Sequence, residues 1–582
     1  MFFETCEKYK KPDAVMVKRD GAFQPVSHKA WRDRVIHFGR GLMTLGVQAK
    51  DHVAILAESS FDWTVADLGI ISSGAVDVPI YPTLTGEQAA WILNNSDSIG
   101  LIVSNRAQAE KINVVRGHLP MIRFIIVMDG DCPEGTMSMA EVEEKGRTAD
   151  NEVDYNKRWT HIQSDQLLTI VYTSGTTGNP KGVMLSHDNL ISNIMSCIQI
   201  CPFGAEDIHL SHLPLSHVLE RMGGYYLTLY AGTTIAFAES IETLSDDMRD
   251  VRPTVLFSVP RLFEKIYTRV ITGARDAGLP KRMIFRWAMG VGKKAVPKLT
   301  QGQQPEGFLA KRWKLADKLV YEKIRERTGG RLKYMIAGGA KLSAEIAEMF
   351  IGMGMTIVEG YGLTETSPVL TINLPEHNKP GSVGPPVPDV ELVIAGDGEI
   401  LARGPNVMMG YYKNPEATQE AIRDGWIYTG DIGHMDEEGF ITVTDRKKDL
   451  IITSGGKNIA PQPLENALKL SPFIEQAVIV GNDRNFIAAL IVPPWETIQD
   501  WARSFGWSTE PEKLVGEEEF RDFLANEITD KMKHFAKYEQ VKKFEILTRP
   551  FTLETGELTP SMKVKRKVVA EKFKKEIEGL YV

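Results

Sequence analysis

Short apolar runs alternate with helical patterns along the first part of the chain, and this alternation restricts the fold most. The run "HVAILAES" (52–59) predicts a strand, "SFDWTVADLGIISSGA" (60–75) a helix, and "VDVPIYP" (76–82) another strand. The same texture returns between "TTIAFA" (233–238) and "GMTIVEGYG" (354–362). Alternating strands and helices are typical of parallel βαβ units. We therefore expect parallel sheets covered by helices on both faces.

The later part of the chain has a different texture. From about residue 387, short strands separated by Gly- and Asp-rich turns predict an antiparallel or barrel-like subdomain over 387–445. A polar stretch, "DRKKDL", follows, and strands such as "QAVIVG" then mix with helices. At 582 residues the chain is too long for one core. We expect an α/β protein with a large N-terminal domain (1–445), a hinge (446–450) and a small, mobile α+β C-terminal domain (451–582).

Composition excludes several classes of protein. A net charge of −8 argues against general nucleic-acid binding. The start of the chain shows no secretory signal, and no run of about 18 apolar residues predicts a spanning helix. The four cysteines are too few and too scattered for a disulfide framework, and two of them, Cys197 and Cys201, fit buried thiols on one helix. We expect a cytoplasmic protein.

The stretch "YTSGTTGNPKG" (172–182) has the composition of a phosphate-binding loop. Glycines allow backbone N–H groups to approach phosphate, and Lys181 adds positive charge. The loop is not a Walker A motif, because Pro180 stands where the second glycine belongs and Gly182 replaces the Ser or Thr. An ordinary glycine-rich connector is the alternative. We expect the loop to follow a strand, "LLTIVY", and to lead toward a helix near "SHDNLISNIMS".

Four further motifs follow in order: "EGYGLTET", "GWIYTGD", "DRKKDLIITSGGKNIAP" and "GELTPSMKVKRK". Together with the first loop they resemble the signatures of the adenylate-forming (AMP-binding) superfamily, over about 390 residues. The resemblance implies binding of ATP. Its triphosphate would lie on Thr173, Ser174, Gly175, Thr176, Thr177, Gly178 and Lys181.

The resemblance also assigns the rest of the nucleotide site. Glu359 would accept a hydrogen bond from the adenine amine, although a solvated strand-end carboxylate is an equal alternative. Thr364 would bind the α-phosphate and Glu365 would ligate Mg²⁺, a cation that prefers carboxylate and phosphate oxygens. Asp431 would accept hydrogen bonds from both ribose hydroxyls, and Arg446 would make a second contact, to the ribose or to a phosphate. The remaining adenine-site residues would be Gly338, Gly339, Ala340, Gly360, Tyr361 and Gly362.

The resemblance gives the C-terminal domain two roles. The family's hinge position corresponds to Lys448. Its adenylation lysine corresponds to Lys563, although Met562 replaces the usual glycine before it, so Lys565 is kept as the alternative. After rotation about the hinge, a second face would serve thioester formation, with Gly455, Gly456 and Lys457 as its candidates.

These parts imply two steps. A carboxylate attacks the α-phosphorus of ATP and gives an acyl-adenylate and pyrophosphate, and coenzyme A then takes the acyl group. The catalytic residues would be Lys563, Glu365, Thr364 and Lys181, which position the reactants and neutralise their charge. The expected co-substrates are ATP, Mg²⁺ and coenzyme A.

A segment rich in Lys and Arg bears on which carboxylic acid is the substrate. From Lys281 to Lys333 there are 15 Lys or Arg against four Asp or Glu. With the C-terminal motifs, this resembles the long-chain fatty acid–CoA ligases. The segment could contact coenzyme A phosphates or anionic lipid headgroups, or be a solvated helical face. A medium-chain or aryl acid, and a fatty-acid-binding or uptake protein with little catalysis, are the alternatives. The resemblance leaves peripheral membrane contact and a homodimer open.

Three histidines, His209, His212 and His217, fit no common zinc spacing. By resemblance His217 lies at the acyl pocket. Some long-chain relatives carry a tryptophan gate four residues further on, but this chain has Arg221 there, so the gate is not assigned.

Overall fold

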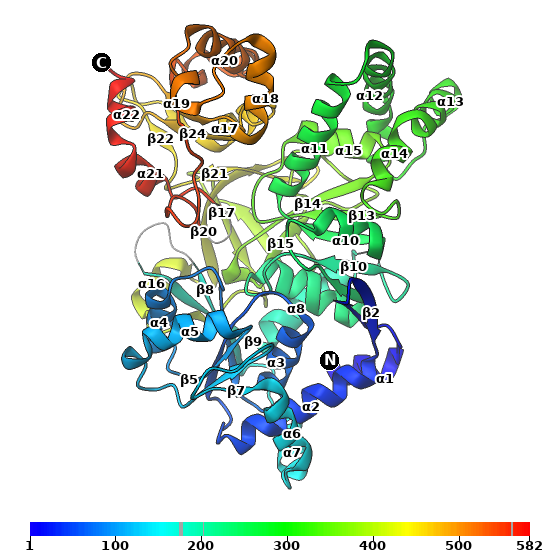
Figure 1. Ribbon diagram of the computed structural model, residues 1–582, viewed down its shortest axis with the longest axis vertical. Helices are drawn as coiled ribbons and strands as arrows, with labels where there is room; N and C mark the ends of the chain where they lie inside the picture. The colour runs from blue at the N-terminus through cyan, green and yellow to red at the C-terminus, as the bar shows by residue number, and fades with distance from the viewer. Residues whose placement is uncertain (174–178, 202, 560–562) are drawn as a thin grey trace.

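The chain forms two domains, and the expected hinge, residues 446–450, lies in the connection between them (Figure 1). The computed structural model describes residues 1–173, 179–201, 203–559 and 563–582. Within these ranges the N-terminal domain holds two eight-stranded sheets and one five-stranded sheet, and the C-terminal domain holds a two-stranded and a three-stranded sheet. The expected α/β class, with large parallel sheets and a small α+β domain, is confirmed.

The first eight-stranded sheet is parallel through its six inner strands, and its two edge strands are antiparallel to them. The inner strand that comes last in sequence, β14 (Thr356–Gly362), ends in the expected adenine-site motif "EGYG". In spatial order the strands are β15 (Val369–Ile372), β14 (Thr356–Gly362), β13 (Tyr334–Ala337), β12 (Val255–Ser258), β10 (Ile208–Ser211), β11 (Thr234–Phe237), β1 (Val15–Arg19) and β2 (Ala22–Val26).

The second eight-stranded sheet is parallel except at one edge, where the glycine-rich loop lies. In spatial order its strands are β18 (Gly410–Tyr411), β9 (Lys181–Ser186), β8 (Leu167–Thr173), β4 (Val76–Ile80), β3 (His52–Leu56), β5 (Ser98–Val103), β6 (Phe124–Val127) and β7 (Met137–Ser138).

The connection after the glycine-rich loop differs from the expectation. The loop joins two antiparallel strands, β8 and β9, instead of leading directly toward a helix. In strand β9, Val183 and Leu185 pack into one small core, whereas Met184 between them packs against another core on the opposite face. Helix α8 (His187–Ile198) begins only afterwards, where the Ser186 side chain accepts a hydrogen bond from the backbone N–H of Asn189.

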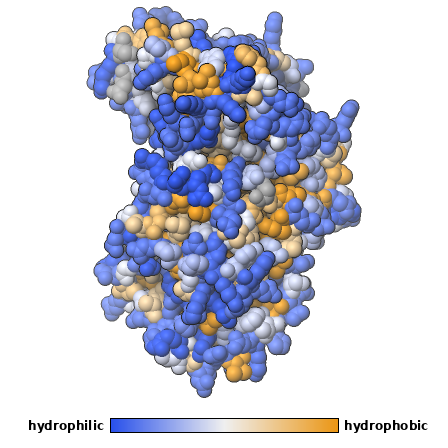
Figure 2. Space-filling view, turned by 90° about the vertical axis from the view of Figure 1, so that its right-hand side faces the viewer, coloured by the Kyte–Doolittle hydropathy of each residue, from blue (hydrophilic) through white to orange (hydrophobic). Residues whose placement is uncertain are grey.

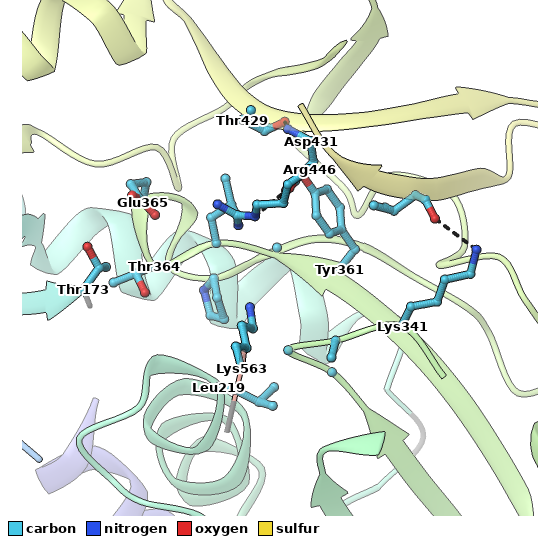
Figure 3. A pocket seen from close by; sticks show the side chains of 18 of the residues that line it. Thr173, Leu219, Lys341, Tyr361, Thr364, Glu365, Thr429, Asp431, Arg446 and Lys563 are labelled. Carbon is cyan, nitrogen blue, oxygen red and sulfur yellow. Dashed lines mark hydrogen bonds and ion pairs between the residues drawn. The ribbon is translucent and has the colours of Figure 1, made fainter. Parts of the chain in front are cut away.

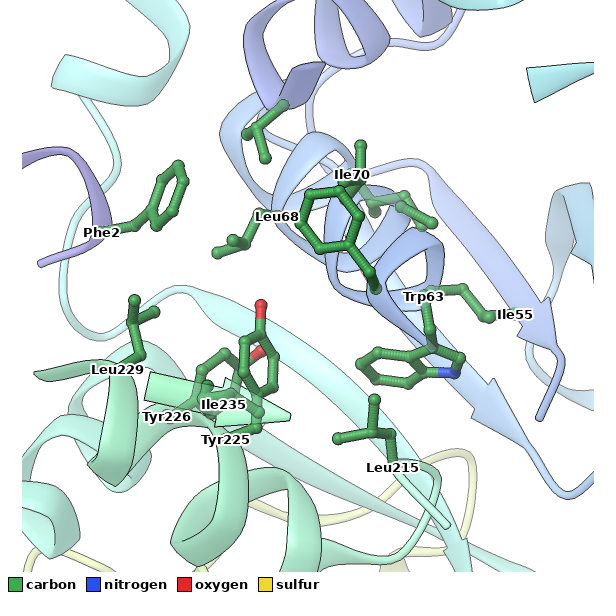
Figure 4. Packing of buried hydrophobic residues seen from close by; sticks show 14 of the residues in the cluster. Phe2, Ile55, Trp63, Leu68, Ile70, Leu215, Tyr225, Tyr226, Leu229 and Ile235 are labelled. Atoms are coloured by element: carbon green, nitrogen blue, oxygen red, sulfur yellow. The ribbon is translucent and has the colours of Figure 1, made fainter. Parts of the chain in front are cut away.

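Three hydrophobic cores separate the layers of the N-terminal domain. Alternate residues of a strand face opposite cores: Ile55 faces the layer between the two large sheets, whereas Ala54 and Leu56 face the outer helices. The middle layer contains aromatic side chains such as Trp63 and Tyr225, which pack with Phe2 from the N-terminus (Figure 4). The outer helices of the second sheet are α4 (Gly86–Asn95) and α5 (Arg106–Val114).

The other helices of this domain fill the middle layer or cover the first sheet (Figure 1). The middle layer and its margin hold α1 (Phe2–Tyr9), α2 (His28–Thr44), α3 (Phe61–Ser72), α6 (Met139–Thr148), α7 (Glu152–Thr160), α8, the π-helical segment η2 (Glu220–Leu227) and α9 (Thr228–Ala231). The first sheet is covered by α10 (Leu244–Val251), α11 (Pro260–Arg275), α12 (Leu279–Leu299), α13 (Gly307–Ala316), the π-helical segment η3 (Asp317–Tyr321), α14 (Glu322–Glu326) and α15 (Ala344–Gly352).

The predicted subdomain near residues 387–445 is a five-stranded antiparallel sheet in the described chain. Helix α16 (Pro415–Ala421) lies between two of its segments. Its last strand ends at Arg446, so the hinge begins directly at a sheet edge. The strands are β16 (Glu391–Ile394), β17 (Glu399–Arg403), β19 (Ile422–Arg423), β20 (Trp426–Met435) and β21 (Ile441–Arg446).

The C-terminal domain has its own cores and docks against α11. Arg261 of α11 forms an ion pair with Glu475, and Glu264 of the same helix lies 3.1 Å from Lys469. Its strands are β22 (Ile451–Ile452), β23 (Asn458–Ile459), β24 (Gln476–Val480), β25 (Ala488–Val492) and β26 (Lys543–Ile546). Its helices are α17 (Pro461–Leu468), α18 (Trp495–Phe505), α19 (Pro511–Leu514), α20 (Glu518–Met532), α21 (Arg566–Lys572) and α22 (Lys574–Gly579).

None of the helices in the described ranges combines the length and the apolar character that crossing a bilayer requires.

Candidate active site

A cavity of about 1220 Å³ lies between the two domains (Figure 3). Most of its wall comes from the N-terminal domain, and the C-terminal domain adds Thr559, Lys563 and Arg566. Five of the sequence motifs meet here, although they are far apart along the chain. The cavity therefore brings together one polar site from both domains.

One end of the cavity holds a preformed cluster of three polar side chains around a single carboxylate, that of Asp431. Tyr361, at the end of β14, donates a hydrogen bond of 2.7 Å from its hydroxyl to Asp431 Oδ2. The guanidinium Nε of Arg446 lies 3.0 Å from Asp431 Oδ1, because the antiparallel register of β20 and β21 pairs these two residues (Figure 3). Burial and the neighbouring Asp431 raise the pKa of the Tyr361 hydroxyl, which therefore remains a hydrogen-bond donor. The cluster offers carboxylate oxygens to a ligand with hydroxyl groups, as a ribose would have.

A wall of small residues lies beside this cluster. Gly338, Gly339 and Ala340 follow β13, and Gly360 and Gly362 lie on β14. Gly339 has a φ of +79°, a conformation that other L-residues rarely adopt. Together with the Tyr361 ring, this wall can hold a flat base against backbone atoms.

Glu359 lies behind this wall and not in it. Its carboxylate accepts hydrogen bonds from the backbone N–H groups of Leu342, at 3.3 Å, and Gly381, at 3.0 Å. Burial raises its pKa to about 7. It is 4% exposed, so it is not the solvated carboxylate that was considered as the alternative. In this structure Glu359 holds two backbone segments together and does not face the cavity.

Thr364 and Glu365 line the cavity in the short 3₁₀ turn Thr364–Thr366, the part where the resemblance places the phosphates. The Tyr411 hydroxyl donates a hydrogen bond of 2.8 Å to Glu365 Oε1. The Lys181 ammonium lies 5.0 Å from the centre of the Tyr411 ring. Tyr411 thus connects a carboxylate with the cation of the glycine-rich loop, because β18 pairs with β9.

Tyr411 was not among the site residues expected from the sequence, because its contact with Glu365 depends on a strand pairing that no local motif reveals. Thr173 and Lys181 line the cavity and face each other across the β8–β9 hairpin. The other expected loop residues, Ser174, Gly175, Thr176, Thr177 and Gly178, lie outside the described residues.

Lys563 projects from the C-terminal domain into the cavity (Figure 3). Its backbone N–H donates to Thr559 Oγ1 at 3.0 Å, and the N–H of Thr559 donates to the Lys563 carbonyl at 2.8 Å, which fixes the position of the lysine. The surrounding protein and then Arg446 lower its pKa to about 8, against the opposing effect of Asp431 and other nearby carboxylates. Lys565, the alternative lysine, does not line the cavity.

The expected hinge residue lies at the margin of the cavity, whereas the expected thioester-step residues lie outside it. Lys448 is exposed at the cavity's margin, whereas the preceding Lys447 pairs with Asp397 and Glu399 of the N-terminal domain. Gly455, Gly456 and Lys457 form the exposed tip between β22 and β23, outside the cavity. The same domain thus directs one lysine inward and one glycine-rich hairpin outward.

The other end of the cavity is apolar, and His217 lies between it and the polar end. The backbone N–H of Leu219 donates to His217 Nδ1 at 3.2 Å. Burial and then nearby Lys563 lower the pKa of His217 to about 4, so the imidazole is neutral. The apolar part of the wall contains Cys197, Cys201, Leu219, Met222, Gly223, Leu227, Phe257, Ile336, Val369 and Ile372.

The two cysteines of this wall fit the expectation in part. Cys197 lies on α8 and is buried, whereas Cys201 lies beyond the last residue of the helix and is partly buried. Burial raises the pKa of both thiols, that of Cys201 to about 12. Both are therefore neutral thiols that add to the apolar lining.

Arg221 does not enter the cavity. Its guanidinium is buried and lies 2.5 Å from Asp67 and 2.6 Å from Asp77, behind the π-helical segment η2. It has no contact with the acyl end of the cavity.

The histidines do not form a metal site. His209 pairs with the buried Glu220 at 3.0 Å, and His212 contacts the Ser258 hydroxyl at 3.1 Å. Among the described residues no three His, Cys, Asp or Glu side chains are grouped as metal ligands.

Comparison with known proteins places this site in a family. A model described as "AMP-binding enzyme" matches residues 2–412, and a model of the "AMP-binding enzyme C-terminal domain" matches residues 448–582. The chain belongs to the AMP-binding enzyme family. The long-chain-fatty-acid–CoA ligase FadD15 of Mycobacterium bovis is 38% identical over 578 residues, which cover 98% of this chain and 95% of the relative. The ligase ACSBG2 of Xenopus laevis is 31% identical, covering 100% of this chain and 83% of the relative.

Solved structures of AMP-binding enzymes share the fold. The anthranilate CoA ligase AuaEII, in complex with anthranoyl-AMP, matches with a TM-score of 0.75 at 18% identity, covering 99% of this chain and 97% of that one. The adenylation domain of a carboxylate reductase from Mycobacterium chelonae matches with a TM-score of 0.79 at 22% identity, covering 100% and 90%. At these identities the match concerns the fold alone.

Proposed function

We propose that this AMP-binding enzyme is a long-chain fatty acid–CoA ligase. It activates the acid with ATP to give acyl-AMP and pyrophosphate, and it then transfers the acyl group to coenzyme A with release of AMP. The observation that carries the proposal is the position of Lys563, in one cavity with the Asp431–Arg446 pair, Glu365 and an apolar end. Relatives named as long-chain-fatty-acid–CoA ligases match nearly the whole chain.

In the first step a fatty acid carboxylate oxygen attacks the α-phosphorus, and the bond between the α-phosphorus and the bridging oxygen to pyrophosphate breaks. No nucleophilic side chain is needed, because the substrate is the nucleophile. Asp431 and Arg446 hold the nucleoside, Thr364 binds the α-phosphate, and Lys181 binds the triphosphate. The Lys563 ammonium lies where it can bridge the carboxylate and the α-phosphate, and it stabilises the charge in the transition state.

Glu365 fits the site of a Mg²⁺ ion. One of its oxygens accepts the Tyr411 hydrogen bond, and it remains beside the phosphate end of the cavity, which suits a cation held by one carboxylate and substrate phosphates. When bound, Mg²⁺ neutralises phosphate charge in the adenylation step.

In the second step the sulfur of coenzyme A attacks the acyl carbonyl, the carbon–oxygen bond to AMP breaks, and the thiol proton leaves to solvent. We place the exposed hairpin of Gly455, Gly456 and Lys457 at the reacting carbonyl in this step, after rotation about Lys448. The neutral His217 marks the border between the nucleotide and the acyl chain, which extends along the apolar wall.

The test is acid-dependent release of pyrophosphate and AMP, with fatty acids from C4 to C18 and with or without coenzyme A. Without coenzyme A, we expect pyrophosphate release only with long-chain acids. When coenzyme A is added, we expect acyl-CoA and AMP as well. Formation of ADP, or nucleotide hydrolysis that is independent of the acid, would overturn the adenylation mechanism. A maximum with short or aryl acids would retain the mechanism and overturn the substrate class.

A further inference from the structure

Helices α12 and α13 project side by side from the N-terminal domain, at the upper right of Figure 1. Neither helix contains an Asp or a Glu, whereas the whole chain has a net charge of −8. Their cations are Lys281, Arg282, Arg286, Lys293, Lys294 and Lys298 on α12, and Lys311, Arg312 and Lys314 on α13.

Few contacts within the protein engage these cations. Among the described residues, Lys298 donates a hydrogen bond to Gln303 Oε1, and Arg312 lies over two aromatic rings. In the described part of the chain no ion pair within 4.0 Å joins any of the nine to a carboxylate. Some cations elsewhere are engaged in such pairs, as Lys18 is with Asp247 and Lys447 with Glu399. The positive charge on α12 and α13 is therefore available to an external partner.

The same helices expose large apolar side chains. Leu279, Met283 and Phe308 are 73%, 71% and 74% exposed. On α12, Leu279 and Met283 share a face with Arg286, while Ala288 and Val291 on the opposite face pack into the core. Since α12 already has a buried face, its exposed apolar residues do not belong to the core.

Arg312 makes the exposed residues of the two helices one continuous surface. Its guanidinium lies 5.8 Å from the centre of the Trp287 ring on α12 and 5.7 Å from that of Phe308 on α13. We call the nine cations together with Leu279, Met283, Phe308 and Leu315 the α12–α13 patch. In Figure 2, which shows this side of the molecule, hydrophobic residues are interspersed with hydrophilic ones.

We propose that the α12–α13 patch docks the protein onto the surface of an anionic lipid bilayer. Cations beside exposed Leu, Met and Phe side chains match the boundary between headgroups and acyl chains, where ammonium groups contact phosphates and apolar side chains enter the bilayer. A free polyanion such as a nucleotide would account for the cations but not for Leu279, Met283 and Phe308. The net negative charge of the rest of the molecule orients the protein, because the patch alone is attracted to an anionic surface.

The patch is connected to the active-site cavity. Pro260 and Arg261, the first residues of α11, line the cavity, and α11 leads within three residues to the start of α12. Docking through the patch therefore holds the cavity close to a bilayer, in which long-chain acids dissolve. The docking proposal itself does not depend on which acid is activated.

The test is sedimentation of the full chain with vesicles at 0.1 M salt. The vesicles contain phosphatidylcholine alone, or phosphatidylcholine with 30% phosphatidylglycerol. We expect binding to the anionic vesicles, weaker binding at 0.5 M salt, and little binding to the zwitterionic ones. Absence of binding to the anionic vesicles, or equal binding to both compositions, would overturn the proposal.

Two matched pairs of variants test the residues. The triple variant Lys281→Gln/Arg282→Gln/Arg286→Gln should lower the partition coefficient about 100-fold, about fivefold per charge. Lys542→Gln/Lys574→Gln/Lys575→Gln removes the same charge from exposed sites of the C-terminal domain and should change binding less than about threefold. Equal losses in both variants would mean that net charge, and not the patch, controls binding, and would overturn the proposal.

The second pair separates apolar insertion from charge. Met283→Ser/Phe308→Ser should weaken binding about tenfold or more. Its control, Val114→Ser/Val153→Ser, alters residues that are 85% and 67% exposed outside the patch and should have no effect. Pyrophosphate formation without vesicles should stay within about twofold of wild type in all four variants, which shows that they are folded. Unchanged vesicle binding of Met283→Ser/Phe308→Ser would exclude insertion and overturn the docking mode.

Discussion

The C-terminal domain places two lysines in very different surroundings. Two hydrogen bonds join Thr559 and Lys563, and Lys563 points into the cavity, where the pKa of its amine falls to about 8. The hairpin tip from 454 to 457 lies in solvent, where Lys457 is 5.5 Å from the Tyr538 ring centre. Under the proposed function we interpret this arrangement as the one for adenylation, and we expect the domain to move before thioester formation.

Replacing Lys563 gives the largest expected effect. Lys563→Ala should slow acid-dependent pyrophosphate–ATP exchange about 10²- to 10³-fold, since it removes a charge aimed at the developing transition state. Thioester formation from supplied acyl-AMP and coenzyme A should change by less than about threefold. Lys565→Ala is the matched control, because Lys565 lies outside the cavity, and it should behave as wild type. If Lys565→Ala loses exchange and Lys563→Ala does not, the two lysines have been assigned the wrong way round.

The pH dependence of adenylation sharpens the same comparison. As pH rises through about 8 the Lys563 amine loses its proton and its charge, so kcat/KM for pyrophosphate formation should fall above that pH, about tenfold by pH 9. Burial lowers this pKa because it disfavours the charged amine. At pH values below the pKa the amine is protonated, so Lys563 should cause no loss of kcat/KM on the acidic side of the pH profile. In Lys563→Arg the alkaline fall should move to higher pH or disappear. A fall that persists unchanged in this variant belongs to another group.

A change in the hairpin should affect the opposite half-reaction. Gly456 has a φ of +72°, so Gly456→Val strains the tip by about 1–2 kcal/mol. Thioester formation from acyl-AMP should slow about five- to tenfold, while pyrophosphate–ATP exchange remains unchanged. Gly506→Val is a control, with a φ of +76° at the end of α18 and no place in either site. Equal effects on both half-reactions would indicate general destabilisation of the domain.

The contact between α11 and the C-terminal domain should give the smallest effect. Lys469→Ala removes the partner of Glu264 in the arrangement seen here, so adenylation should slow about twofold relative to thioester formation. A double-mutant cycle with Glu264→Ala isolates the pair, and the ratio of the two rates is the measurement. Additive effects of the two substitutions would show that the ion pair does not favour this arrangement.

Much of the fold could be predicted from periodicity, but some contacts could not. Strands β3 and β4 and helix α3 match their predicted segments because their apolar residues follow the spacing of each element. Strand β9 was missed because its alternating pattern is short and directly follows a glycine-rich loop. Tyr411 was missed because its contact with Glu365 depends on the pairing of β18 with β9, more than 200 residues apart in sequence.

The candidate site shows the same limit. Asp431, Arg446 and Lys563 meet in the cavity as their motifs imply, since each motif fixes a short local geometry. Glu359 was expected at the adenine, but its carboxylate is occupied by two backbone N–H groups that no local pattern reveals. Their donors, Leu342 and Gly381, come from separate loops, and only tertiary structure brings them together.

Lys563 and the 454–457 tip are both parts of the C-terminal domain, and this also determines the order of the two half-reactions. Both belong to one domain, whose two cores lie on opposite faces of the same sheet, so we expect that they do not occupy the reacting centre simultaneously. Pyrophosphate must therefore depart before the thiol arrives, and steady-state kinetics should follow a ping-pong scheme, with parallel double-reciprocal lines for ATP at different coenzyme A concentrations. Between the two events the enzyme holds its activated acyl group as a bound intermediate, so the rate of domain rotation limits how long that intermediate is exposed to water.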